Sequence, residues 1–211
     1  MHPWFAIVER AREADPIMAT PEVRRMRHRI LLSAIALCVT AGTSSAEVVN
    51  VAPNGFSVKH AMTIQASPEN VYATLTGKVG SWWNPEHTYS HDSKNLSIDA
   101  RPGGCFCEKL GNGGGVEHMR VVLAWPGQML RMTGALGPLQ GSGLAGSMTW
   151  KLTVATGATG AAGATSLEFS YSAGGYMQGG FEKIAPAVDA VLGEQLTRLK
   201  AFVETGKPAT K

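Results

Sequence analysis

The sequence predicts an α+β domain in which a curved antiparallel sheet of about seven strands wraps around a long C-terminal helix, with two short helices after the first strand. Two patterns lead to this fold class. The last long segment, 184–204, repeats apolar residues at helical spacing. Much of the chain before it alternates apolar and polar residues between glycine-rich turns, which is typical of β-strands. An apolar helix face and an apolar sheet face are each buried when they pack together.

The C-terminal helix is the longest element that the sequence predicts. Pro186 falls in its first turn, where a missing backbone N–H is tolerated. Gly206 follows its last turn and ends it. The apolar face includes small residues, namely Ala187, Val188 and Gly193. We therefore expect this helix to form one wall of a space rather than to fill it.

The first part of the domain is predicted to form one strand and two short helices. Residues 56–66 alternate apolar and polar side chains, as a half-buried strand does. Ser67 and Pro68 fit the N-cap and first position of a short helix. Residues 78–84 carry two adjacent tryptophans and predict a second short helical turn. The polar segment 86–95 is expected to be a loop.

Six more strands are predicted before the long helix. Short turns join most consecutive strands, so the sheet is expected to be antiparallel. In the last two strands every second residue is apolar, which indicates one face toward the core. Residues 137–146 are expected to be a loose connection. The six predicted strands are 96–100, 105–110, 116–124, 129–135, 147–155 and 165–172.

The N-terminal region has the pattern of an export signal. A basic start is followed by an apolar run of about ten residues, and Ser44 and Ala46 supply small residues for cleavage. We therefore expect a periplasmic or secreted protein with no membrane-spanning segment after cleavage. The segment 1–25 is predicted to be either untranslated, with Met26 as the true start, or disordered. The other predicted parts are a signal peptide 26–46, with a buried helix or membrane anchor as the alternative, a linker 47–55, the folded domain 56–206 and a tail 207–211.

The charge balance gives no indication of a nucleic-acid partner. The chain after Ala46 holds 13 basic and 12 acidic residues, a net charge of +1. Proteins that bind nucleic acids present clustered basic surfaces. The sequence does not determine the oligomeric state.

The cysteine and histidine pattern does not predict a metal site. Cys105 and Cys107 follow the predicted cleavage site and are one residue apart, so a bridge between them would close a small, strained ring. They are interpreted as two small residues on one strand face, with a redox or metal role as the alternative. His87, His91 and His118 add no paired ligand spacing of the zinc type.

No cofactor is predicted either. The glycine-rich segment 141–146 matches the dinucleotide-binding fingerprint in its letters. That fingerprint requires a helix directly after it, so that the helix N-terminus meets the pyrophosphate. Residues 148–154 instead have a strand pattern, which argues against the match.

Several short motifs occur in a recognisable order before the long C-terminal helix. They are Ser67-Pro68-Glu69-Asn70-Val71-Tyr72, Trp82-Trp83, Arg101-Pro102-Gly103-Gly104 followed by Phe106 and Glu108, and Trp125-Pro126-Gly127 before Met129-Leu130. This order resembles the START-like helix-grip superfamily, also labelled SRPBCC. The resemblance covers roughly 56–206 and implies a helix-grip fold, in a superfamily that includes lipid binders, polyketide cyclases and aromatases, and chaperone activators. It does not specify the chemistry, because one fold hosts many functions.

Glu108 and His118 are the candidate acid and base. Glu108 shares a strand face with Phe106; if that face points inward, burial raises the pKa of the Glu108 carboxyl. The alternative is a strand-end glutamate paired with Arg120 or Lys109 near solvent. His118 and Arg120 are expected on one face of their strand. His118 either faces the cavity, where it orients a ligand or relays a proton, or it is exposed.

A further set of apolar and aromatic residues is predicted to line a ligand cavity, with core packing as the alternative for several of them. Two come from the second short helix, three from strands and two from the long helix. The hydroxyl of Tyr171 needs a buried partner or a ligand. The predicted ligand-binding residues are Trp82, Trp83, Met132, Trp150, Tyr171, Val188 and Leu192.

These features predict an exported domain that binds a small apolar or amphipathic molecule between the sheet and the C-terminal helix. The first alternative is a cyclase- or aromatase-like enzyme that uses Glu108 and His118. The second is an interaction protein of envelope stress or assembly. A chaperone-activator role does not fit an exported protein, because that partner is cytosolic.

Overall fold

The structure, a computed structural model, describes residues 45–156 and 163–210, and the side chains from Asn50 onward within them. The predicted extension 1–25 and all but the last two residues of the predicted signal peptide 26–46 lie outside the described residues.

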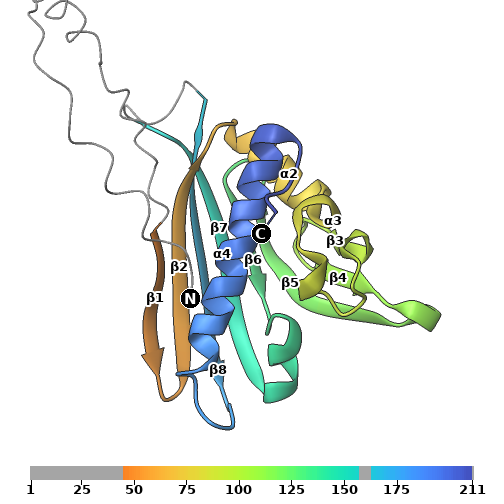
Figure 1. The fold of residues 1–211 in the computed structure, drawn as a ribbon, viewed down its shortest axis with the longest axis vertical. Coiled ribbons are helices and arrows are strands. Elements are labelled where there is room, and N and C mark those ends of the chain that lie inside the picture. Colours follow the sequence, from red (N-terminus) through yellow and green to blue (C-terminus); the bar gives the residue numbers. More distant parts are fainter. Residues whose placement is uncertain (1–44, 157–162, 211) are drawn as a thin grey trace, which may run out of the picture. The chain divides into compact units, whose positions relative to one another are not determined.

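Eight antiparallel strands form one curved sheet, and a long helix lies across it (Figure 1). The strand order is β1-β2-β8-β7-β6-β5-β4-β3. The first strand, β1, pairs with β2 at the edge of the sheet, and β2 pairs with the last strand, β8. The remaining strands follow β8 in reverse chain order. The strands are β1 Ser45–Ala52, β2 Gly55–Ile64, β3 Leu96–Ile98, β4 Cys105–Lys109, β5 Gly115–Trp125, β6 Met129–Thr133, β7 Leu144–Val154 and β8 Thr165–Gly175.

The helices confirm the predicted α+β class and its helix-grip arrangement. The long helix follows the last strand, and the two short helices follow β2. No helix of the described part is long and apolar enough to cross a membrane. The α-helices are α2 Pro68–Gly77, α3 Val79–Trp82 and α4 Ile184–Thr205; the 3₁₀ turns are η1 Pro85–His87, η2 Ser93–Asn95, η3 Gly111–Gly113 and η4 Gly137–Ser142.

Part of the predicted linker 47–55 is a strand instead. The backbone of β1 pairs with β2 from Ser45↔Ala61 to Ala52↔Gly55, with one irregularity after Val48. Without this strand, the outer edge of β2 would expose unpaired N–H and C=O groups. Pairing with β2 therefore accounts for this eighth strand. The sequence of 47–55 has no clear alternation and did not predict it.

The connection 137–146 is more ordered than predicted. Residues 137–142 form the turn η4, with Pro138 in its first turn and Leu139 buried. Gly143 has a φ of 69°, a conformation that glycine adopts at little cost, and β7 begins directly after it. The buried Leu139 anchors this segment against the domain.

The predicted inward faces of β7 and β8 are confirmed with one exception. Val154, predicted to lie with them, is 59% exposed at the last position of β7. Alternation along each strand sends the other apolar residues to the core. The buried residues of these two faces are Met148, Trp150, Leu152, Leu167, Phe169 and Tyr171.

Helix α4 lies close to β2 through a buried histidine. His60 is 2% exposed, and its Nε2 lies 2.8 Å from Oδ1 of Asp189 on the helix. The ring also packs against Phe169, with ring centroids 6.1 Å apart. A Cβ added at Gly193 would lie 3.0 Å from Cε1 of His60. The space expected beside Gly193 is therefore filled by a protein side chain.

We predict that Gly193→Leu destabilises the domain, because the added side chain meets the His60 ring. Overpacking costs about 1–3 kcal/mol, more than the gain of roughly 0.8 kcal/mol from a better helix former. Urea unfolding measures the change in the free energy of unfolding. Ala190→Leu, on the exposed face of the same helix, is the control and should not destabilise. Equal stability of Gly193→Leu and wild type would contradict this packing.

Candidate functional site

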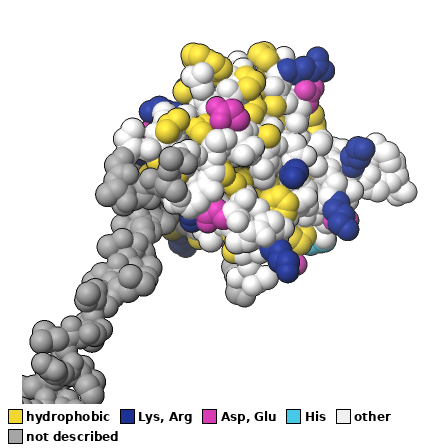
Figure 2. All heavy atoms as spheres, turned by 90° about the horizontal axis from the view of Figure 1, so that it is seen from above, with side chains coloured by type: hydrophobic (Ala, Val, Ile, Leu, Met, Phe, Trp, Pro, Cys, Tyr) yellow, Lys and Arg dark blue, Asp and Glu magenta, His cyan; other side chains and the backbone are white. Residues whose placement is uncertain are grey.

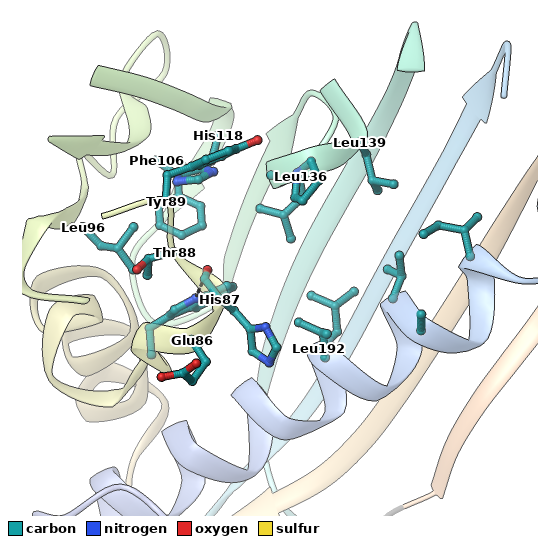
Figure 3. A pocket seen from close by; sticks show the side chains of 17 residues that line it. Glu86, His87, Thr88, Tyr89, Leu96, Phe106, His118, Leu136, Leu139 and Leu192 are labelled. Atoms are coloured by element: carbon teal, nitrogen blue, oxygen red, sulfur yellow. Dashed lines mark hydrogen bonds between the residues drawn. The ribbon is translucent and has the colours of Figure 1, made fainter. Parts of the chain in front are cut away.

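A pocket of about 290 Å³ lies beside α4 (Figure 3). The helix supplies one apolar wall, because residues spaced three or four apart share one face. This wall consists of Ile184, Ala187, Val188, Val191 and Leu192.

The other walls come from segments far apart in the sequence. Trp83 directly follows α3, and the segment Glu86–Tyr89 comes from η1 and the loop after it. Phe106 lies on β4 and His118 on β5, and Leu136–Leu139 covers another side. Tyr89 is 49% exposed, and Ala187 on the helix wall is also exposed, so the pocket opens to the surface beside them.

The loop wall is held to α4 by polar contacts. Asn84 donates its backbone N–H to Oε1 of Gln195 at 2.8 Å, and its amide donates to Glu194. Nε2 of His87 lies 3.3 Å from Oε2 of Glu194. The carbonyl of Trp82 accepts a hydrogen bond from Nε of Arg198. These contacts set the separation of the helix wall from the loop wall.

Glu108 points inward and is not the solvent-exposed strand-end glutamate of the alternative interpretation. It lies behind the pocket wall and does not line the pocket. The residue is 2% exposed. Its Oε1 accepts the Ser90 N–H at 2.6 Å, and its Oε2 accepts the Tyr89 N–H at 3.1 Å. Nε2 of His118 lies 2.9 Å from the same Oε2. Glu108 therefore joins the pocket loop to the histidine and contacts neither Arg120 nor Lys109 through an ion pair.

A β-bulge determines the orientation of His118. On β4, Phe106 pairs with Met119 and the next residue, Cys107, pairs with Glu117, which leaves His118 as the extra residue on β5. Met119 and His118 are consequently both buried. The prediction that His118 and Arg120 share a face is wrong, because the extra residue breaks the alternation; Arg120 is exposed and pairs with Glu117.

The His118 ring lies among aromatic rings on the pocket wall. Its centroid is 5.1 Å from that of Phe106 and 6.0 Å from that of Tyr89, with the tyrosine ring stacked at 21°. Its Nδ1 is buried and has no hydrogen-bond partner within 45–156 and 163–210. An ionised carboxylate only accepts hydrogen bonds, so Glu108 directs the ring hydrogen to Nε2 and leaves a lone pair on Nδ1.

The pair is expected to be an anion beside a neutral imidazole at neutral pH. Burial raises the pKa of the Glu108 carboxyl, but hydrogen bonds from Ser90, Tyr89 and His118 outweigh this effect and hold that pKa below its ordinary value. Burial lowers the pKa of the His118 imidazole, and the opposing hydrogen bond and charge of Glu108 do not restore it. The pKa of Glu108 is therefore lowered and not raised, contrary to the expectation from burial alone, because several hydrogen-bond donors surround its carboxylate.

The predicted ligand-binding residues divide between the pocket wall and the core. Trp83, Val188 and Leu192 line the pocket. The other four are buried within the core cluster and do not line this pocket, since their strand or helix faces point at other apolar side chains. They are Trp82, Met132, Trp150 and Tyr171.

The hydroxyl of Tyr171 has a protein partner rather than a ligand. It accepts the backbone N–H of Leu136 at 3.1 Å. Burial raises the pKa of the Tyr171 phenol, and this hydrogen bond opposes the rise only in part. Tyr171 therefore positions Leu136, which does line the pocket.

Several pocket residues were not predicted. Thr88 and Tyr89 belong to the polar segment 86–95, which is predicted to be a loop, and Leu139 belongs to the predicted loose connection 137–146. The local sequence pattern gave no sign of either. The sequence offered one weak signal that this segment packs against the domain: the large side chains of Tyr89 and Leu96 follow Pro85.

Cys105 and Cys107 form a disulfide, contrary to the interpretation as two separate thiols. Their Cα atoms are 5.4 Å apart, within the ordinary range for a disulfide. The two residues are two positions apart on β4, so strand alternation places their side chains on the same face. Within the described ranges, no group of three or more His, Cys, Asp or Glu side chains is arranged to hold a metal ion.

Comparisons with known proteins show the fold alone. No family model matches the chain, and no curated protein matches it. A protein of unknown function from Enterococcus faecalis, EF2215, has a TM-score of 0.53 at 19% identity, covering 79% of this chain and 80% of that chain. CalU16 from Micromonospora echinospora has a TM-score of 0.51 at 14% identity, covering 78% and 88%.

A third similar structure is an uncharacterised protein from Rhizobium leguminosarum, with a TM-score of 0.50 at 16% identity, covering 77% of this chain and 98% of that chain. The coverage extends over most of each protein. The shared architecture is therefore the whole domain and not a fragment of it.

We predict that acid destabilises the domain through the Glu108–His118 pair. Both folded-state pKa values lie below their ordinary values, so the unfolded chain binds protons first as the pH falls. The stabilisation is full above about pH 6.5 for the histidine and about 4.3 for the glutamate, and is lost below those values. Urea unfolding measured from neutral to acidic pH tests this prediction.

The variant His118→Phe separates the two contributions. It should reduce the loss of stability that begins near pH 6.5 and keep the loss at lower pH that comes from carboxylates. An unchanged pH dependence in this variant would show that His118 does not titrate as described.

Proposed function

We propose that the domain binds a small, mostly apolar molecule in the pocket beside α4. The observation that carries this proposal is an open pocket of about 290 Å³ whose walls are mostly apolar and aromatic. Ligand sites are commonly concave, largely apolar and provided with a few polar groups. The resemblance to the START-like superfamily supports the same function.

The ligand is proposed to be compact. The pocket volume is at the lower end of the range of about 300–1,000 Å³ that is usual for ligand sites. Trp83 and Phe106 lie 5.4 Å apart with an edge-to-face angle of 67°, and both line the pocket. Such rings favour a flat or aromatic molecule over a long acyl chain.

Acid–base catalysis is a second candidate function, and one observation favours it. His118 lines the pocket, and Glu108 orients its ring through Nε2 at 2.9 Å. A neutral imidazole held in one tautomer is suited to accept a proton from a bound molecule. In this scheme His118 is the base, and Glu108 is a positioning residue because it does not line the pocket.

We further propose that the domain is exported. The pattern of 26–46 supports a signal peptide, and the Cys105–Cys107 disulfide is of a kind that persists in oxidising compartments. On the face drawn in Figure 2, Lys and Arg side chains stand apart from one another among apolar and uncharged atoms. On this face the basic side chains do not form the clustered surface that nucleic-acid binding requires.

We predict that Ala187→Trp blocks ligand binding, because the indole enters the pocket from the helix wall. The fluorescence enhancement of N-phenyl-1-naphthylamine, a neutral apolar dye, measures binding. The affinity should fall by about tenfold or more, which corresponds to about 1.4 kcal/mol.

The matched control is Ala190→Trp, one turn away on the same helix, where the residue is exposed and does not line the pocket. It should bind the dye as the wild type does. If the two variants bind equally well, the dye lies elsewhere and the proposed site is wrong.

A further inference from the structure

We propose that Nδ1 of His118 is the polar specificity determinant of the pocket, and that it selects aromatic ligands that carry a hydrogen-bond donor such as a phenolic hydroxyl. This inference rests on the proposed binding function and names the chemical class of the ligand. It depends on which polar atoms of the walls already have partners.

Three polar side chains of the walls have hydrogen-bond or ion-pair partners within the protein. The Thr88 hydroxyl donates to the Pro85 carbonyl at 2.7 Å. Nε1 of Trp83 donates to the His87 carbonyl at 3.1 Å, and Nε2 of His87 lies near Glu194. None of these groups therefore needs a ligand to complete its hydrogen bonds.

His118 is different. Among the buried polar side-chain atoms that lack a hydrogen-bond partner in the described part of the chain, its Nδ1 is the one that belongs to a residue lining the pocket. The residue is 4% exposed, so bulk water does not easily replace the missing partner. An unpaired buried polar atom destabilises the folded protein, and a ligand that pairs with it recovers part of that lost stability.

Glu108 decides which kind of ligand group can pair with Nδ1. It is held by the N–H groups of Tyr89 and Ser90 as well as by His118, so its carboxylate is saturated with donors. It therefore requires a hydrogen on Nε2 of the imidazole, and Nδ1 is left as an acceptor. The complementary ligand group is a donor, O–H or N–H, and not a carbonyl or an ether.

The surroundings of Nδ1 define the rest of the ligand. The rings of Phe106 and Tyr89 lie 5.1 and 6.0 Å from the His118 ring, and the opposite wall is the aliphatic face of α4. Aromatic pairs of this kind add to the energy of area burial. A planar aromatic body with one donor group matches both the apolar walls and the buried acceptor Nδ1 of His118.

The test compares naphthalene, 2-methoxynaphthalene and 2-naphthol, which share one aromatic body. Dissociation constants are measured by titration of the intrinsic tryptophan fluorescence at a pH of about 8, where the imidazole is neutral. The wild type should prefer 2-naphthol over both other compounds by about two- to tenfold, the range expected for one hydrogen bond.

In His118→Phe, which keeps a ring at this position but removes Nδ1, the preference for 2-naphthol should disappear while naphthalene still binds. The matched control is His91→Asn, since His91 is exposed outside the pocket at a φ of 56°, which asparagine tolerates. This control should keep the preference.

The possible failures differ in their meaning. If none of the compounds binds to the wild type, the proposed function is wrong. If all three bind the wild type equally, or the preference survives in His118→Phe, the pocket binds apolar molecules but Nδ1 does not select them. If His118→Phe does not fold, the ¹⁵N resonance of Nδ1 in the wild type decides: it should shift with 2-naphthol, and an identical response to naphthalene would overturn the proposal.

Discussion

The pocket depends on the unequal contact of α4 with the two sides of the curved sheet. On the β2 side, His60 fills the notch at Gly193 and pairs with Asp189, so the helix lies close to the strand. A straight helix cannot follow a twisted sheet along both of its sides. Toward β4 and β5, contacts through Asn84 and Glu194 hold the η1 loop between helix and sheet instead. The space that remains there is the pocket.

The buried carboxylate of Glu108 connects the pocket loop at Tyr89 to the imidazole of His118. Glu108 accepts hydrogen bonds from the Tyr89 and Ser90 backbone and lies 2.9 Å from Nε2 of His118. A buried charge is costly unless several donors surround it, and here three do. The loop, the histidine and the sheet therefore depend on the same group. This explains how an acidic residue outside the pocket influences what the pocket presents to a ligand.

The sequence predicted the repeating parts of this protein better than its exceptions. Alternation along β7 and β8 and the spacing of Val188 and Leu192 reflect burial on one face, and burial is repeated along an element. The bulge at His118 is one extra residue in one strand pair, which no local pattern reveals. For the same reason, the polar loop that contains Tyr89 gave no sign that it forms a wall.

The sequence by itself determined the α+β class and the long C-terminal helix, because periodicity and turn residues act locally. It left open whether Glu108 points inward or lies near solvent. Only the tertiary structure decided which apolar residues line a space and which fill the core. Trp83 and Trp82 are neighbours in the chain, yet one lines the pocket and the other is buried in the core. That difference depends on how far the helix and the sheet lie apart at each point, and this separation is set by contacts between residues more than 100 positions apart, such as His60 with Asp189.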